Sequence, residues 1–118
     1  YKRQIYGDKA KAMGLPMFVP DDVHQERVMA AIYGPQGAKA GYTNGICRED
    51  LISAAEYLVK THGCNCLILG CTELPLILDE SDDFKVAGSR VIVVDPTAAL
   101  ARKVVKTAED AYAATGIR

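Results

Sequence analysis

Apolar residues recur at helical spacing in four stretches of the chain, residues 1–13, 21–32, 48–62 and about 96–115. Continuous aliphatic runs, typical of buried strands, occupy residues 15–19, 64–70 and 91–94. Strand and helix therefore alternate along the chain, which is typical of α/β domains. The pattern predicts an α/β fold in which helices flank an open, mainly parallel sheet.

Capping residues and breakers mark where these elements end. Gly14 and Gly63 suit the C-terminal caps of two helices. The Asp21–Asp22 pair suits an N-terminal cap, and Pro96 after a capping Asp95 suits the start of the last helix. The second helix carries an apolar stripe of Val23, Val28, Ala31 and Ile32. A glycine-containing loop, a short helix and a polar connection are predicted at residues 34–45, 74–78 and 79–89.

Composition and charge indicate a globular domain and argue against a nucleic-acid-binding or membrane protein. The 118 residues are 49% hydrophobic and 25% charged, which is ordinary for a globular domain. The formal net charge is -1, from 14 basic and 15 acidic residues, and no block of one sign favours binding to nucleic acid or to an anionic membrane. Gly70 and Pro75 interrupt the longest apolar stretch, which is too short for a membrane span.

The chain begins at Tyr1, within what the pattern predicts to be a helix already in progress. We therefore expect residues 1–118 to be one domain at the C-terminal end of a longer protein. The predicted strands are short and make a thin sheet, which further N-terminal elements would complete.

The chain contains four cysteines, Cys47, Cys64, Cys66 and Cys71. Its aliphatic content is sufficient for a core without disulfides, so we expect free thiols in a reducing cytoplasm. Cys64 and Cys66 lie on a predicted strand and are assigned to packing, and Cys47, which precedes a helix, is assigned a structural role. Cysteines spread along one strand do not converge on one ion, so no metal site is expected.

The segment from Gly70 to Glu73 carries the candidate chemistry. It follows an aliphatic strand, and ligands of α/β sheets bind beyond the carboxyl ends of strands. The N–H groups at the start of the predicted short helix would favour a thiolate and bind carboxylates. We interpret Cys71 as a catalytic thiol, Thr72 as a hydroxyl donor, and Glu73 as a group that orients a neighbour or an ammonium. The alternative is that Cys71 is a small buried apolar residue.

The run from Gly70 to Leu76, GCTELPL, resembles the second cysteine signature of the aspartate/glutamate racemase superfamily. Glutamate racemases carry His where this chain has Glu73, so the variant is similar to the aspartate and broad-specificity branch. The run from Val91 to Thr97 also resembles the last strand and final helix cap of that family.

The resemblance implies two similar α/β domains, each of which supplies one cysteine to a cleft between them. The two thiols would flank the substrate Cα, and one removes a proton while the other delivers one, without pyridoxal phosphate or metal. Cys71 would be the C-terminal acid/base, and its partner would lie in an N-terminal domain absent from this chain. The resemblance further implies a homodimer, and the helix at residues 96–115 is expected to pack on the absent domain.

Lys39 lies in the predicted loop, between Gly37 and Gly41. The resemblance implies that this lysine contacts the side-chain carboxylate of an acidic amino-acid substrate. The alternative is a solvated loop lysine. The loop is not a phosphate-binding loop, because no Gly-Lys-Ser/Thr follows.

The remaining polar candidates are assigned structural roles. His24 near a helix start and His62 near a helix end are expected at the surface. Asp95 and Thr97 are expected to cap the last helix, and the alternative for Thr97 is that it reaches the cleft.

Other functions remain open at the level of sequence. Hydantoin racemase, maleate isomerase and arylmalonate decarboxylase belong to the same superfamily and also use a thiol. A non-catalytic domain that holds a small carboxylate is a second class. A redox sensor is a third, although no resolving cysteine for Cys71 is evident.

Overall fold

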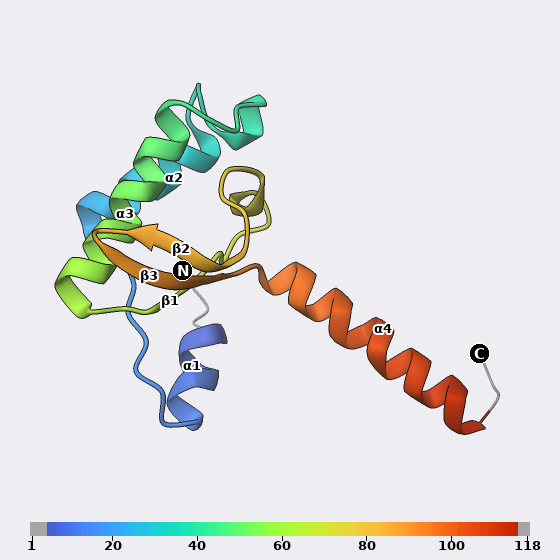
Figure 1. The fold of residues 1–118 in the computed structure, drawn as a ribbon. Helices are drawn as coiled ribbons and strands as arrows, with labels where there is room; N and C mark the ends of the chain where they lie inside the picture. The colour runs from blue at the N-terminus through green and yellow to red at the C-terminus, as the bar shows by residue number, and fades with distance from the viewer. Residues whose placement is uncertain (1–4, 116–118) are drawn as a thin grey trace.

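The computed structural model describes residues 5–115 (Figure 1). Its helices are α1 (Ile5–Ala12), α2 (Asp22–Tyr33), α3 (Ile46–His62) and α4 (Pro96–Thr115). Its strands are β1 (Cys66–Ile68), β2 (Ser81–Val86) and β3 (Ser89–Val94), and its short 3-10 turns are η1 (Ala38–Ala40) and η2 (Leu74–Leu76). The predicted α/β class is confirmed.

The predicted helices form, and local capping explains their ends. The Asp21 carboxylate accepts a hydrogen bond from the His24 backbone N–H at 2.9 Å and begins α2. Gly63 ends α3 in the left-handed conformation, with φ 66°. The Asp95 carboxylate accepts from the Thr97 N–H at 3.0 Å and begins α4, as predicted. The predictions for residues 1–4 and for the helix stop at residue 116 lie outside the described residues.

The strands form a single three-stranded sheet in the order β1-β3-β2. β1 runs parallel to β3, with Leu67 opposite Val93, and β2 runs antiparallel to β3. The sheet is open but mixed, rather than mainly parallel. β1 also lies at an edge, and not at the covered centre that its apolar run indicated.

The β2 strand lies within residues 79–89, which were predicted to be a polar connection. Its sequence carries few apolar residues, and only Val86 is fully buried, so its hydrophobic pattern is weak. Ala87 and Gly88 join it to β3 with positive φ angles of 52° and 77°. Alanine is rare in that conformation, so the turn also lacks the usual sequence signal.

The segment at residues 15–19 was predicted to be a strand, and this is wrong. It pairs with no strand of residues 5–115, and Leu15 and Val19 are 56% and 61% exposed. Pro16 has no N–H to donate to a ladder. Phe18 stacks on His62 with ring centroids 4.3 Å apart, which ties this extended segment to the end of α3.

The core lies on one face of the sheet, where α2 and α3 pack together (Figure 1). Its largest aliphatic members are Ile32, Leu51, Val59, Leu67, Leu69, Leu74, Ile77, Leu78, Val86, Val91 and Val93. On the predicted stripe of α2, Ala31 is also buried and Val28 packs against the core, but Val23 is 65% exposed. The opposite sheet face is uncovered, because Ile68 and Ile92 are 41% and 47% exposed.

The α4 helix extends away from the rest of the molecule (Figure 1). Its apolar residues Leu100, Val104 and Val105 are 64%, 56% and 57% exposed. Near its first turns, the Arg102 Nη1 atom donates to the Glu80 Oε1 atom at 2.8 Å. The apolar residues that predicted α4 therefore pack against no other element within residues 5–115.

Candidate functional site

The turn that carries Cys71 follows β1, the strand that pairs in parallel with β3. The Leu69 N–H donates to the Val94 carbonyl at 2.9 Å, which extends the β1–β3 ladder by one residue. The chain then turns, and the Leu74 N–H donates to the Cys71 carbonyl at 3.1 Å. Leu69 and Leu74 are buried on either side of the turn, so packing holds the Cys71 backbone at the carboxyl end of β1.

A guanidinium from α3 supports the segment that follows. The Arg48 Nη1 atom donates to the Ile77 carbonyl at 2.9 Å, and Ile77 is itself buried. Sequence reasoning missed this contact, because an arginine in the first turn of a helix has no local partner that predicts it.

A short helix was predicted after Cys71, and the structure has one. The segment forms η2, a 3-10 turn of three residues, Leu74–Leu76. A single short turn does not build the dipole of a longer helix, so the N-terminal dipole expected to favour a thiolate is absent. Neighbouring side chains therefore determine the surroundings of the thiol.

The side chains around Cys71 meet at one carboxylate oxygen. The Cys71 thiol donates to the Glu73 Oε1 atom at 3.7 Å, and the Thr72 hydroxyl donates to the same oxygen at 3.2 Å. Cys71 is half-buried and packs against the edge of the core. Glu73 keeps 25% of its side chain exposed, so the cluster lies at the surface.

The predicted substrate-binding lysine reaches the same oxygen. The Lys39 Nζ atom lies 3.6 Å from the Glu73 Oε1 atom, and its side chain is 49% exposed. The ammonium also lies 5.6 Å from the centroid of the Tyr33 ring, a cation–π contact that the sequence did not indicate. The structure thus brings together Cys71, Thr72, Glu73 and Lys39, which we call the thiol cluster.

Close packing of the backbone positions Lys39. Gly37 precedes η1, and a Cβ atom built there would lie 2.7 Å from the Ala31 carbonyl oxygen and 2.8 Å from that of Ala30. Glycine therefore lets this loop touch the end of α2. Gly41 ends η1 with φ 95°, another conformation that favours glycine. The predicted loop thus contains a short ordered turn that carries Lys39.

The other three cysteines lie outside the thiol cluster. Cys47 is fully buried in the first turn of α3, and its thiol donates to the Asn44 carbonyl at 3.3 Å. Its structural assignment agrees with this position. Cys64 is half-buried and Cys66 is exposed, so the core positions predicted for both are wrong. Partial burial, with a smaller repulsion from Cys66, raises the pKa of the Cys64 thiol above its ordinary value.

The polar residues assigned to structural roles are engaged in local contacts. The His24 Nδ1 atom lies 2.6 Å from the Asp21 Oδ1 atom, and its ring stacks on Tyr57 with centroids 4.6 Å apart. The His24 side chain is therefore partly covered rather than fully exposed. Hydrogen bonding to His24 lowers the pKa of Asp21. His62 stacks on Phe18.

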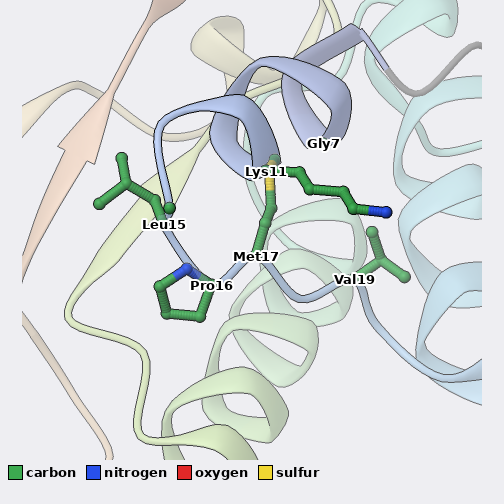
Figure 2. Close-up of a pocket in the computed structure, with 7 residues that line it drawn as sticks. Gly7, Lys11, Leu15, Pro16, Met17 and Val19 are labelled. Atoms are coloured by element: carbon green, nitrogen blue, oxygen red, sulfur yellow. The ribbon is translucent and has the colours of Figure 1, made fainter.

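An open hollow lies elsewhere on the described part of the chain. It has a volume of about 650 Å³ and is formed by α1 and the extended segment after it. Figure 2 shows Leu15, Pro16, Met17 and Val19 around it, with Lys11 as its charged group. None of its lining residues belongs to the thiol cluster, and an open, mostly aliphatic hollow offers no acid or base pair for catalysis.

Residues 5–115 contain no clustered metal ligands and no membrane-spanning helix. No group of three or more His, Cys, Asp and Glu side chains within that range is arranged to hold a metal ion. None of the helices there combines the length and apolar character that crossing a membrane requires.

Comparison with known proteins identifies the family. Residues 2–104 match the family model described as Asp/Glu/Hydantoin racemase. An uncharacterized protein in the pnlA 3' region of Pectobacterium carotovorum subsp. carotovorum is 35% identical over 105 residues. That alignment covers 89% of this chain and 64% of the relative, so the chain spans less than two thirds of the relative's length. The chain, with its cysteine turn at the carboxyl end of a parallel strand, belongs to the Asp/Glu/Hydantoin racemase family.

Proposed function

We propose that the protein is a cofactor-independent racemase of an acidic amino acid, aspartate or glutamate, with Cys71 as one of two acid/base thiols. The observation that carries this proposal is the thiol cluster. A thiol and an ammonium both lie within 3.7 Å of one carboxylate oxygen, Oε1 of Glu73, just after the end of a parallel strand. These groups supply a proton carrier beside a cation that can bind a carboxylate.

Racemisation at Cα requires proton removal on one face and delivery on the other. Two fixed groups, one on each face, achieve this without moving the substrate. Holding both groups close to Cα also accelerates the proton transfers. Cys71 serves one face in this proposal. Cys47 is buried in the core, Cys64 lies before β1, and Cys66 is the first residue of β1, so none of them is a suitable partner. A second domain would supply the opposite thiol.

Lys39 is proposed to bind the side-chain carboxylate of the substrate. Its ammonium is half-exposed and already lies beside a carboxylate, Glu73. A substrate carboxylate could take the same place on the ammonium, while Thr72 supplies a hydroxyl donor close by.

Further proposals concern the complete protein. A second domain would cover the exposed apolar side of α4, and the whole would form a cytoplasmic homodimer. The exposed Leu100 and Val104 support the first of these, because exposed aliphatic residues along one helix mark a packing surface.

The test is racemisation of aspartate and glutamate by the full-length gene product in deuterated water. We expect deuterium at Cα mainly in the product enantiomer, because each thiol acts on one face. Cys71→Ser should lower the rate in both directions by at least a hundredfold, the scale of a lost acid/base group. Cys66→Ser, an exposed cysteine outside the cluster, is the matched control and should retain activity.

Full activity in Cys71→Ser would refute the proposed mechanism. Activity only on a hydantoin, on maleate or on an arylmalonate would refute the proposed substrate class but not the catalytic role of the Cys71 thiol. Binding of a small carboxylate without turnover would indicate a non-catalytic binding domain.

A further inference from the structure

We infer that Glu73 is a positioning residue that holds Cys71 in its protonated, proton-donating form, and that Lys39 limits this effect. The inference deepens the proposed function and rests on it, because it assigns Cys71 the role of the acid in the resting protein. It depends on the geometry of the thiol cluster.

The first step concerns the hydrogen bond from the thiol. The Cys71 Sγ atom donates to the Glu73 Oε1 atom at 3.7 Å, and only the neutral thiol has a proton to donate. A hydrogen bond to the neutral form and a nearby negative charge both oppose ionisation. Glu73 therefore favours the thiol over the thiolate.

The second step concerns the counter-charge. The Lys39 Nζ atom lies 3.6 Å from the same oxygen and offsets part of its negative charge. The Thr72 hydroxyl also donates to that oxygen at 3.2 Å. Donors on the carboxylate weaken its hold on the thiol proton, so the protonation of Cys71 depends on what Lys39 contacts.

Other titratable groups come from the elements around the turn. Tyr6 of α1 lies near Gly70, with its ring 3.9 Å from the position of an added Cβ. Arg48 of α3 is engaged with the Ile77 carbonyl. Asp95 follows Val94, whose carbonyl accepts a hydrogen bond from the Leu69 N–H. Within residues 5–115, the ionisable group that contacts the Cys71 thiol directly is Glu73, through a hydrogen bond. Lys39 is the cation that forms an ion pair with Glu73.

The consequence for the reaction is a change on substrate binding. When the carboxylate of the substrate binds the Lys39 ammonium, Glu73 loses its counter-charge. The Glu73 carboxylate then becomes a stronger proton acceptor. The S–H bond of Cys71 stays intact until its proton passes to the substrate carbanion at Cα, which leaves a thiolate on Cys71. In the reverse reaction this thiolate accepts the Cα proton, so that atoms and charges balance without any co-reactant.

The experiment measures the pH dependence of iodoacetamide alkylation of Cys71 in the full-length protein, by peptide mass spectrometry. Glu73→Gln keeps the size of the side chain and removes its charge. It should shift the curve to lower pH and make alkylation about three- to tenfold faster at neutral pH, since one pH unit is a tenfold change. Glu73→Asp, which restores the charge, should return the curve towards that of the wild type. Lys39→Met should shift the curve to higher pH.

Two controls separate this effect from a structural change. The alkylation curve of Cys64 in the same samples should not move, because Cys64 lies outside the thiol cluster. Glu109→Gln, which removes the same charge from the exposed α4, should leave the Cys71 curve unchanged.

A Cys71 curve that is unchanged in Glu73→Gln, or that moves to higher pH, would overturn the inference. The measurement needs no substrate, so its failure differs from failure of the proposed function. Racemisation with an unmoved curve would refute only the role of Glu73. A moved curve in a protein that racemises no amino acid would refute only the proposed reaction.

Discussion

At the residue scale, Gly37 decides where Lys39 lies. A methyl group there would meet the Ala31 carbonyl oxygen at 2.7 Å, so the backbone of η1 or the end of α2 must move. Since Lys39 lies two residues further on, the displacement should separate its ammonium from Glu73.

We therefore predict that Gly37→Ala reproduces the defect of Lys39→Ala in the full-length protein. Both should raise the KM for acidic amino acids, and Lys39→Ala should cost about 1.5–3 kcal/mol in kcat/KM, the scale of one charged hydrogen bond. Steady-state kinetics measure both variants. Gln36→Ala, an exposed neighbour in the same loop, should behave as the wild type. Unaltered kinetics in Gly37→Ala would contradict this account of the loop.

At the element scale, an ion pair between Arg102 and Glu80 connects the first turns of α4 to the segment before β2. Hydrogen bonding from Arg102 lowers the pKa of Glu80 below its ordinary value of 4.5. A carboxyl whose pKa is lower in the folded state contributes stability that is present above its unfolded pKa and is lost as pH falls through the folded pKa.

We predict that Glu80→Gln lowers Tm at pH 7 and lowers it less at pH 3. At pH 7 the wild-type carboxylate is ionised and paired with Arg102, and this attraction is lost as the pH falls through its lowered folded-state pKa. The effect should be small, because both side chains are exposed. Thermal unfolding at the two pH values measures the difference. A Tm difference that is larger at pH 3 than at pH 7 would contradict the pairing.

At the scale of the whole molecule, residues 5–115 leave the apolar side of α4 and one apolar face of the sheet uncovered. The α4 helix has the spacing of a packed helix, yet Leu100 and Val104 remain exposed within the described chain. Such a surface agrees with the proposal that α4 packs on a further domain.

We predict that Val104→Asp destabilises the full-length protein by about 2–4 kcal/mol, the range for an unpaired charge placed in a packed interface. In the isolated 118-residue chain the same change should alter stability by less than about 0.5 kcal/mol, because Val104 is 56% exposed there. Lys106→Ala, on the polar side of α4, should be nearly neutral in both proteins. Denaturant unfolding measures all three, and equal effects of Val104→Asp in the two proteins would exclude a covering domain.

The sequence by itself determined the elements that depend on neighbours along the chain. Apolar spacing and local caps such as Asp21, Gly63 and Asp95 specify α2, α3 and α4, because helices form from contacts three and four residues apart. The aliphatic run before Gly70 likewise predicted that Cys71 follows a parallel strand.

Only the tertiary structure decided features that depend on residues distant in sequence. β2 forms because it pairs with β3, although its own pattern is polar, and β1 lies at an edge because nothing in residues 5–115 pairs beyond it. Lys39 meets Glu73 because α2 packs on α3 and Gly37 permits a close approach. Pairing and packing partners are chosen by the whole fold, and a local sequence window contains only one side of each contact.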